Sequence, residues 1–180
     1  MISMRRKKEF LEVIQIRAAR IAVSASATRG QRAPGLVAAA RGYLGTLPLD
    51  QFAVARPQLF KERLNHATSE LIRVFPKDGR SWGMARKLLN IFLRDAFYTA
   101  YLKDAYRLEV AEHNYELPLD SITARHLRAD AAKGHLPRWR GVKYLTPQAS
   151  EILQATAATI ASSRGIARIH LDAYWWGGSR

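Results

Sequence analysis

Residues 82–107 carry apolar side chains at every third or fourth position, and no other segment of the chain keeps this pattern for so long. The spacing places these side chains on one face of an α-helix. The face is formed by Met84, Leu88, Ile91, Phe92, Ala96, Phe97 and Tyr101. Ser81, directly before the segment, is a good N-cap residue. Because so wide a face needs cover from several other elements, we expect this helix at the centre of the core.

Shorter segments with helical spacing lie on both sides of it, separated by glycine and proline. We expect helices over residues 7–28, 35–43, 57–75, about 120–130 and 146–163. Thr146 followed by Pro147 is a strong start signal for the last of these. Asp50 is expected to cap a further helix, and a polar turn is expected over residues 112–116.

The C-terminal segment 166–176 fits either a helix or a strand. We favour a helix, because no other segment offers a strand to pair with it. Its aromatic residues Tyr174, Trp175 and Trp176 are expected to pack as a lid over a small core, with stacking on a nucleic-acid base as the alternative. The predicted fold class is therefore all-α: a single compact multi-helix domain over residues 1–180, with two small helical lobes around a cleft as its variant.

The charge of the chain predicts its partner. Lysine and arginine number 29 against 15 aspartates and glutamates, which gives a net charge of +14. The excess lies in the first 41 residues, which include the basic N-terminal helix expected over about 5–28, and in the last 60. Such a field attracts polyanions, so we expect nucleic acid as the partner, DNA rather than RNA. Protein partners are compatible with the sequence but not identifiable from it.

The sequence lacks the residues that several kinds of catalytic or metal site require. The chain has no cysteine, which excludes disulfides, thiolate zinc sites and a cysteine nucleophile and fits a reducing compartment. Its five histidines show no metal-ligand spacing, and no nucleotide-binding glycine motif occurs. We therefore expect no metal and no cofactor. Glu9 and Glu12 interrupt the stretch after the basic start, so we expect a cytoplasmic protein without a membrane partner, and association with the nucleoid is compatible.

Lys87 and Asp120 have the residue types of a nucleophile and its acidic partner. A lysine amine with a depressed pKa can attack a sugar carbon or form a Schiff base, and a nearby carboxylate can take a proton or stabilise an oxocarbenium-like centre. One long helix and a return segment separate the two residues, so the fold can bring them together. The alternative is that Lys87 is a surface base and that Asp120, in Pro-Leu-Asp-Ser, caps the next helix.

The same two stretches resemble the helix-hairpin-helix base-excision DNA glycosylases, especially the archaeal 8-oxoguanine type. The stretches are Gly-Met-Ala-Arg-Lys-Leu-Leu-Asn-Ile-Phe-Leu at 83–93 and Leu-Pro-Leu-Asp-Ser-Ile-Thr-Ala-Arg-His-Leu at 117–127. The resemblance implies that Lys87 is the nucleophile, that Asp120 is its partner, and that a base is extruded into a cleft.

The resemblance also implies a hairpin that binds DNA phosphates directly before the lysine. The family has Gly-x-Gly at this place, whereas here Gly79 and Gly83 are spaced differently. Hairpin glycines bring backbone amides close to phosphates. In this chain we expect Lys77, Arg80 and Arg86 to supply that contact by charge.

The segment 133–144 alternates basic and aromatic side chains. Such a segment can hold phosphates and stack on unpaired bases. We predict nucleic-acid contacts for Lys133, Arg138, Trp139, Arg140 and Lys143, and for Arg125 and Arg128 on the preceding helix. The alternative is a solvated loop that Trp139 anchors in the core.

The sequence thus predicts a helical DNA-binding protein that resembles a base-excision DNA glycosylase of DNA repair, with enzymatic activity undecided. The alternative is a non-catalytic nucleic-acid-binding or assembly subunit of a repair, defence or ribonucleoprotein complex. The two differ in structure. Lys87 and Asp120 should line one cleft in the enzyme, and should face solvent on opposite sides in the subunit.

Overall fold

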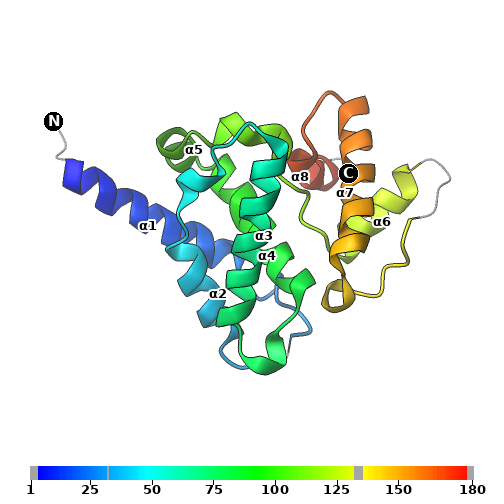
Figure 1. The fold of residues 1–180 in the computed structure, drawn as a ribbon, viewed down its shortest axis with the longest axis horizontal. Coiled ribbons are helices and arrows are strands. Elements are labelled where there is room, and N and C mark those ends of the chain that lie inside the picture. Colours follow the sequence, from blue (N-terminus) through cyan, green and yellow to red (C-terminus); the bar gives the residue numbers. More distant parts are fainter. Residues whose placement is uncertain (1–3, 32, 132–135, 178–180) are drawn as a thin grey trace.

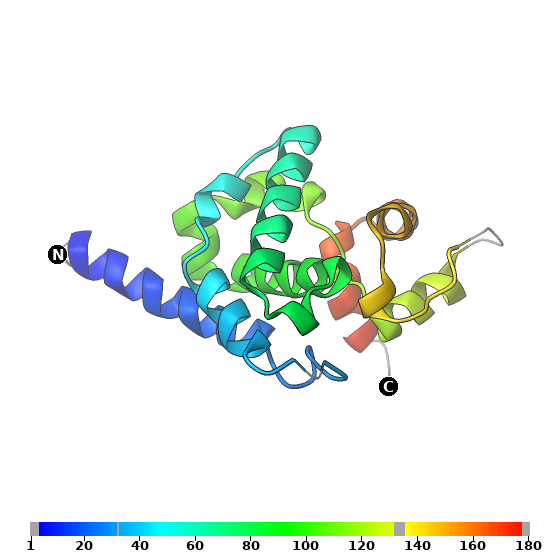
Figure 2. The ribbon, with the colours of Figure 1, turned by 60° about the horizontal axis from the view of Figure 1, so that its bottom comes forward.

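Helix α4, Trp82–Tyr98, runs through the middle of the structure, with other helices packed around it (Figures 1 and 2). The structure is a computed structural model and describes residues 4–31, 33–131 and 136–177. Every residue from 83 to 90 is buried, charged ones included. The prediction of a central helix is therefore confirmed.

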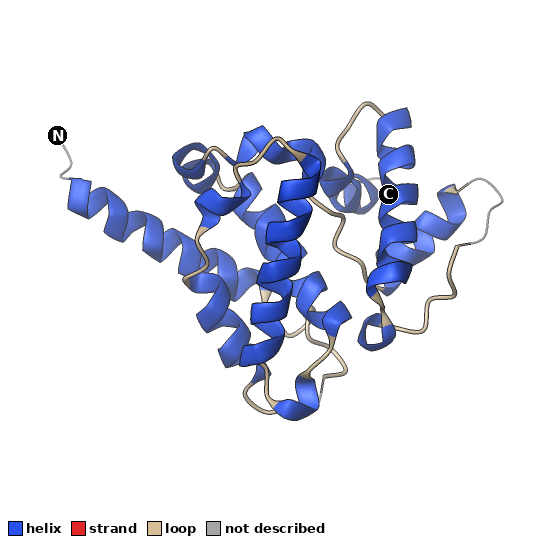
Figure 3. Ribbon diagram, in the orientation of Figure 1, coloured by secondary structure: helices blue, strands red, loops and turns tan. Residues whose placement is uncertain are grey.

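The chain is all-α over the ranges that the structure describes, without a β-strand (Figure 3). The elements besides α4 are α1 (Met4–Ala22), α2 (Leu36–Gly45), α3 (Pro57–Val74), α5 (Ala100–Tyr106), α6 (Ser121–Asp130), α7 (Pro147–Ser163), α8 (Leu171–Gly177) and the 3-10 helices η1 (Leu49–Phe52), η2 (Lys77–Gly79), η3 (Leu108–Asn114), η4 (Val142–Tyr144) and η5 (Arg168–His170). The predicted fold class is confirmed.

Two helix starts are as the sequence predicts. The Ser81 hydroxyl accepts a hydrogen bond from the Met84 amide at 3.3 Å and caps α4. The Thr146 hydroxyl accepts from the Ala149 amide at 3.2 Å and caps α7. Local capping chemistry is sufficient in both cases.

Other boundaries differ from the prediction. The segment 82–107 is two helices, because the Thr99 backbone is extended and its hydroxyl donates back to the Asp95 carbonyl at 2.7 Å. Asp50 caps no α-helix; it lies inside the short helix η1. Helix α1 ends at Ala22, six residues earlier than expected, and residues 112–116 largely continue the 3-10 helix η3.

The core is divided into two clusters of buried side chains. The larger cluster lies among α1 to α5 and η3, in the lobe formed by residues 4–115. The smaller one lies among α6, α7 and α8, in the lobe formed by residues 116–177. Ala167 and Ile169 of the smaller lobe pack into the larger cluster and join the two. The described residues thus form one all-α domain whose core is divided between two lobes.

The C-terminal aromatic residues belong mainly to the smaller lobe. Trp175 is 6% exposed and its ring stacks on His126 at a centroid distance of 5.0 Å, as expected for a residue that closes a small core. Tyr174 is exposed and lies under the guanidinium group of Arg164. The side chain of Trp176 lies outside the described residues.

Candidate functional site

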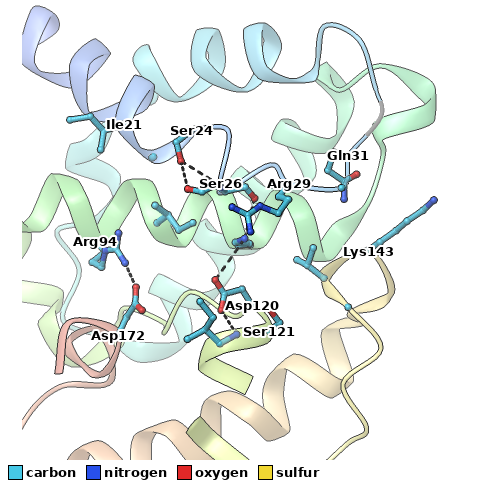
Figure 4. A pocket seen from close by; sticks show the side chains of 18 of the residues that line it. Ile21, Ser24, Ser26, Arg29, Gln31, Arg94, Asp120, Ser121, Lys143 and Asp172 are labelled. Atoms are coloured by element: carbon cyan, nitrogen blue, oxygen red, sulfur yellow. Dashed lines mark hydrogen bonds and ion pairs between the residues drawn. The ribbon is translucent and has the colours of Figure 1, made fainter. Parts of the chain in front are cut away.

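A pocket of about 690 Å³ opens between the two lobes. The end of α1 and the loop 24–31 form one wall, α4 forms the floor, and the start of α6, the turn 139–143 and α8 form the rest. Figure 4 shows Ser24, Ser26 and Arg29 on one side and Asp120 with Ser121 on the other.

Lys87 lies on the floor of this pocket and is 8% exposed. Its Nζ donates a hydrogen bond to the Ala27 carbonyl at 3.0 Å and lies 3.8 Å from Oδ2 of Asp120. Burial lowers the pKa of Lys87, and the charges of Asp120 and Asp172 oppose that shift. In its neutral form the amine can keep its one hydrogen bond, to the Ala27 carbonyl, without using its lone pair.

Asp120 has two tasks at once. Its Oδ1 accepts hydrogen bonds from the amides of Ile122 at 2.8 Å and Thr123 at 3.0 Å, and the Thr123 hydroxyl accepts from the Asp120 amide, which completes a capping box for α6. Its Oδ2 faces Lys87. Asp120 therefore caps α6, as one interpretation predicted, and also lies close to Lys87, as the other predicted. Its role in catalysis remains a prediction.

The loop 24–31 presents the Ala27 carbonyl to Lys87. A helical turn orders this loop: the Thr28 amide and hydroxyl both donate to the Ser24 carbonyl, at 3.1 and 3.0 Å. Gly30 has a φ of 82°, which few other residues adopt. Sequence reasoning missed this part of the site, because a backbone carbonyl leaves no mark on the residue pattern.

Arg94, Asp95 and Asp172 form an ion-pair cluster in the pocket. Figure 4 shows Arg94 and Asp172 at one end of it. Burial raises the pKa of both carboxyl groups, and Arg94 opposes the shift. These residues were also missed. A signal was present, because Arg94 follows Lys87 by two helical turns and therefore lies on the same face of α4.

The nucleic-acid contacts predicted for α6 and for the segment 133–144 fall into three groups. Lys143 and Trp139 line the pocket, the former exposed and the latter half-buried and packed on the smaller core. Outside the pocket, four others are exposed, namely Arg125, Arg128, Arg138 and Arg140. Lys133 lies outside the described residues. Their contacts with nucleic acid remain predictions.

The turn between α3 and α4 carries the exposed residues Lys77 and Arg80, away from the pocket. The guanidinium of Arg80 donates to the Phe75 carbonyl at 3.3 Å. A Cβ added to Gly83 would lie 2.1 Å from the Val142 carbonyl oxygen, so the first turn of α4 is packed against η4.

The prediction for Arg86 is wrong. It is 4% exposed, and its guanidinium donates to the Thr68 hydroxyl at 2.7 Å and to the Asn65 side-chain carbonyl. Its Nε lies 3.2 Å from Oε2 of Glu116, and the Trp82 ring lies against its other face. A DNA phosphate has no access to this group, because the protein encloses it on every side.

In the part of the chain that the structure describes, no three histidine or carboxylate side chains come close enough together to hold a metal ion. None of the described helices has both the length and the apolar character that crossing a bilayer requires. Comparison with protein-family models, with curated proteins and with solved structures found no match to this chain.

Proposed function

We propose that this chain is a DNA-binding protein with a core like that of the helix-hairpin-helix glycosylases, which excises a base through attack of Lys87 on the sugar C1′. The observation that carries the proposal is the placement of Lys87. Its amine is desolvated, donates to the Ala27 carbonyl, lies 3.8 Å from Oδ2 of Asp120, and lines a pocket between two lobes. The net charge of +14 supplies the attraction for DNA.

The proposed reaction uses the neutral amine of Lys87. Its lone pair forms a bond to C1′ of an extruded nucleotide, while the C1′–N bond breaks and its electron pair leaves with the base, which takes up a proton. Asp120 accepts the proton that Nζ loses and stabilises the positive charge that develops at C1′. The C1′–O4′ bond then breaks as the nitrogen lone pair forms the C1′=N bond, O4′ takes up the proton held by Asp120, and a protonated imine joins Nζ and C1′.

The size and lining of the pocket support a substrate of this kind. Ligand pockets typically enclose about 300–1,000 Å³, and a nucleoside fits within that range. The lining combines the aromatic ring of Trp139 and apolar groups such as Ile91 with hydroxyl groups and charges. Stacking and hydrogen bonding are the means by which extruded bases are held.

Borohydride trapping tests the proposal, because the reductant converts the imine into a stable covalent adduct. The wild-type protein should be trapped on at least one oligonucleotide of a panel of damaged DNA, and Lys87→Gln should give no adduct. Lys103→Gln is the matched control, since Lys103 lies on α5 away from the pocket. If no oligonucleotide is cleaved or trapped, the enzymatic part of the proposal is wrong.

A non-catalytic nucleic-acid-binding subunit is the second candidate. It is favoured by the structural contacts of the pair, since Lys87 bonds the loop 24–31 and Asp120 caps α6. This function predicts DNA binding that Lys87→Gln leaves intact, with no trapped adduct for either protein. A competition between DNA and RNA would show which nucleic acid such a subunit prefers.

A further inference from the structure

We infer that the DNA strand is held at the pocket by phosphate contacts from Arg29 and Lys143, and not by the hairpin between α3 and α4. The inference rests on the proposed function, because the strand is the one whose sugar Lys87 would attack. It adds Arg29, on the loop 24–31, to the residues that contact DNA.

Arg29 and Lys143 are the cations of the pocket that have no partner in the protein. Both side chains are exposed, and neither makes a hydrogen bond or an ion pair with any residue in the described ranges. Arg94, in the same pocket, is paired with two carboxylates. The pocket also contains three aspartates, but none of them pairs with Arg29. The guanidinium of Arg29 is therefore available to bind an added anion.

The charges of the pocket are arranged in a gradient. Arg94 with Asp95 and Asp172 makes one end acidic, with one positive group against two negative ones. Lys143 lies at the other end, and Arg29 projects over the pocket between the loop and Asp120 (Figure 4). The acidic end repels phosphate, so the strand should cross the pocket at the end that carries the two free cations.

The covalent structure of the DNA strand requires phosphate groups near the mouth of the pocket. A nucleotide whose C1′ reaches Nζ of Lys87 has a phosphate on each side of its sugar, and neither can enter the pocket without losing its hydration. Both must therefore lie at the mouth. Arginine matches a phosphate with two parallel hydrogen bonds, and lysine acts as a point charge.

The hairpin has little to offer a phosphate. Arg80 is directed back to the end of α3, where it donates to the Phe75 and Arg73 carbonyls. Lys77 is followed by Asp78, which offsets its charge. The first turn of α4 is closed by the Ser81 cap and by the contact of Gly83 with η4, so its amides do not face an incoming anion.

Binding to a single-stranded oligonucleotide with a tetrahydrofuran abasic analogue tests the inference without any chemistry, because the analogue has no base to release. Fluorescence anisotropy should show an affinity loss of about tenfold for Arg29→Gln and for Lys143→Gln. Each should also reduce the slope of log K against log salt by about 0.7. The matched double variant Lys77→Gln/Arg80→Gln should change the affinity less than about twofold.

Each outcome is decisive. If the hairpin variant loses as much affinity as the pocket variants, or if the pocket variants bind like the wild type, the placement of the strand is wrong while the proposed function stands. If the wild-type protein does not bind the oligonucleotide at all, the proposed function fails and this inference with it. Circular dichroism of the variants shows whether each one is folded.

Discussion

Arg86 and Lys87 are neighbours on α4 and are both buried, yet they lie in opposite kinds of surroundings. Arg86 points toward α3, where its Nη1 and Nη2 donate to Thr68 and Asn65, and its Nε lies 3.2 Å from Oε2 of Glu116 without a hydrogen bond. Lys87 has a backbone carbonyl on one side, a carboxylate at 3.8 Å on another, and otherwise a pocket. Burial of a cation is therefore no sign of function by itself. What distinguishes the two is access: the protein encloses the guanidinium of Arg86, whereas Lys87 lines a pocket.

The helix produces this difference by geometry alone. Successive residues of an α-helix point about 100° apart, so one of the two faces α3 and the other faces the loop 24–31 and α6. Burial lowers the pKa of both side chains, and the nearest carboxylate, Glu116 or Asp120, opposes the shift in each case. For a lysine the shift favours a neutral amine, whereas an arginine stays charged.

Among the substitutions that test this comparison, Arg86→Met should have the largest effect on stability. Removing one partner of a buried ion pair leaves the other without compensation, so we expect a loss of about 3–5 kcal/mol in the free energy of unfolding, measured with urea. The uncompensated groups are the carboxylate of Glu116 and the polar side chains on α3. Arg73→Met, which removes an exposed ion pair with Glu70, should change stability by less than about 1 kcal/mol. A loss below about 1 kcal/mol for Arg86→Met would contradict a structural role.

Gly83→Ala tests how the pocket side of α4 is held. The added methyl group would meet the Val142 carbonyl oxygen at 2.1 Å and the Leu145 Cβ at 2.7 Å, so backbone must move. We expect a loss of about 1–3 kcal/mol. Because η4 carries Lys143 to the pocket, DNA affinity should fall as well.

Gly42→Ala is the matched control for this substitution. Gly42 lies inside α2, and a Cβ there would meet nothing within 4 Å. Alanine has the higher helix propensity, so this variant should be more stable by about 0.5–1 kcal/mol. A loss at Gly42, or no loss at Gly83, would show that the close approach to η4 does not constrain α4.

The sequence predicted those parts of the fold that local chemistry determines. Ser81 and Thr146 are capping residues whose partners lie three positions later, so a single turn is enough to define them. The break at Thr99 was not predictable in this way, because the apolar period continues through it to Tyr101 and Leu102. Asp50 has the same capping chemistry as Asp120, but it lies in η1, between Leu49 and Phe52, which are buried.

The site shows the same division. Lys87 and Asp120 were found through their side-chain chemistry and the resemblance of their two stretches to the glycosylases, and the fold does bring them together. Arg86 was assigned wrongly because an enclosed arginine and a surface arginine have the same letter in a sequence. Ala27 and Arg29 were missed because the loop 24–31 reaches the pocket only through the packing of α1 on α4.

Lys87→Met should change the free energy of unfolding in the opposite direction to Arg86→Met. The wild-type protein desolvates a charge at Lys87, so methionine should stabilise it by about 0.5–1 kcal/mol at neutral pH. Urea unfolding of both proteins measures the difference. A loss of about 2 kcal/mol or more would show that Lys87, like Arg86, is a structural cation.

The pH dependence of that gain follows from the direction of the pKa shift. The pKa of Lys87 in the folded protein lies below its ordinary value of 10.5, so the unfolded chain binds more protons between the two values. The stability of the wild type should therefore rise with pH across that interval. The advantage of Lys87→Met should be largest near neutral pH and should disappear as the pH passes 10.5.

Asp120→Asn should have the smallest effect on stability and separates the two tasks of this residue. Asparagine caps helices as well as aspartate does, so its side-chain oxygen can still accept from Ile122 and Thr123, and we expect a change within about 0.5 kcal/mol. Asp120→Ala, which also removes the cap, should lose about 1 kcal/mol.

The same substitution removes the charge that keeps the Lys87 pKa from falling further. Adduct formation requires the neutral amine, so its rate should rise with pH, and in Asp120→Asn the half-maximal point should move to lower pH while the maximal rate falls, because no carboxylate accepts the proton. Borohydride trapping at a series of pH values measures both. If the pH profile stays where it is in the wild type, Oδ2 of Asp120 has no influence on Nζ, and the carboxylate serves α6 alone.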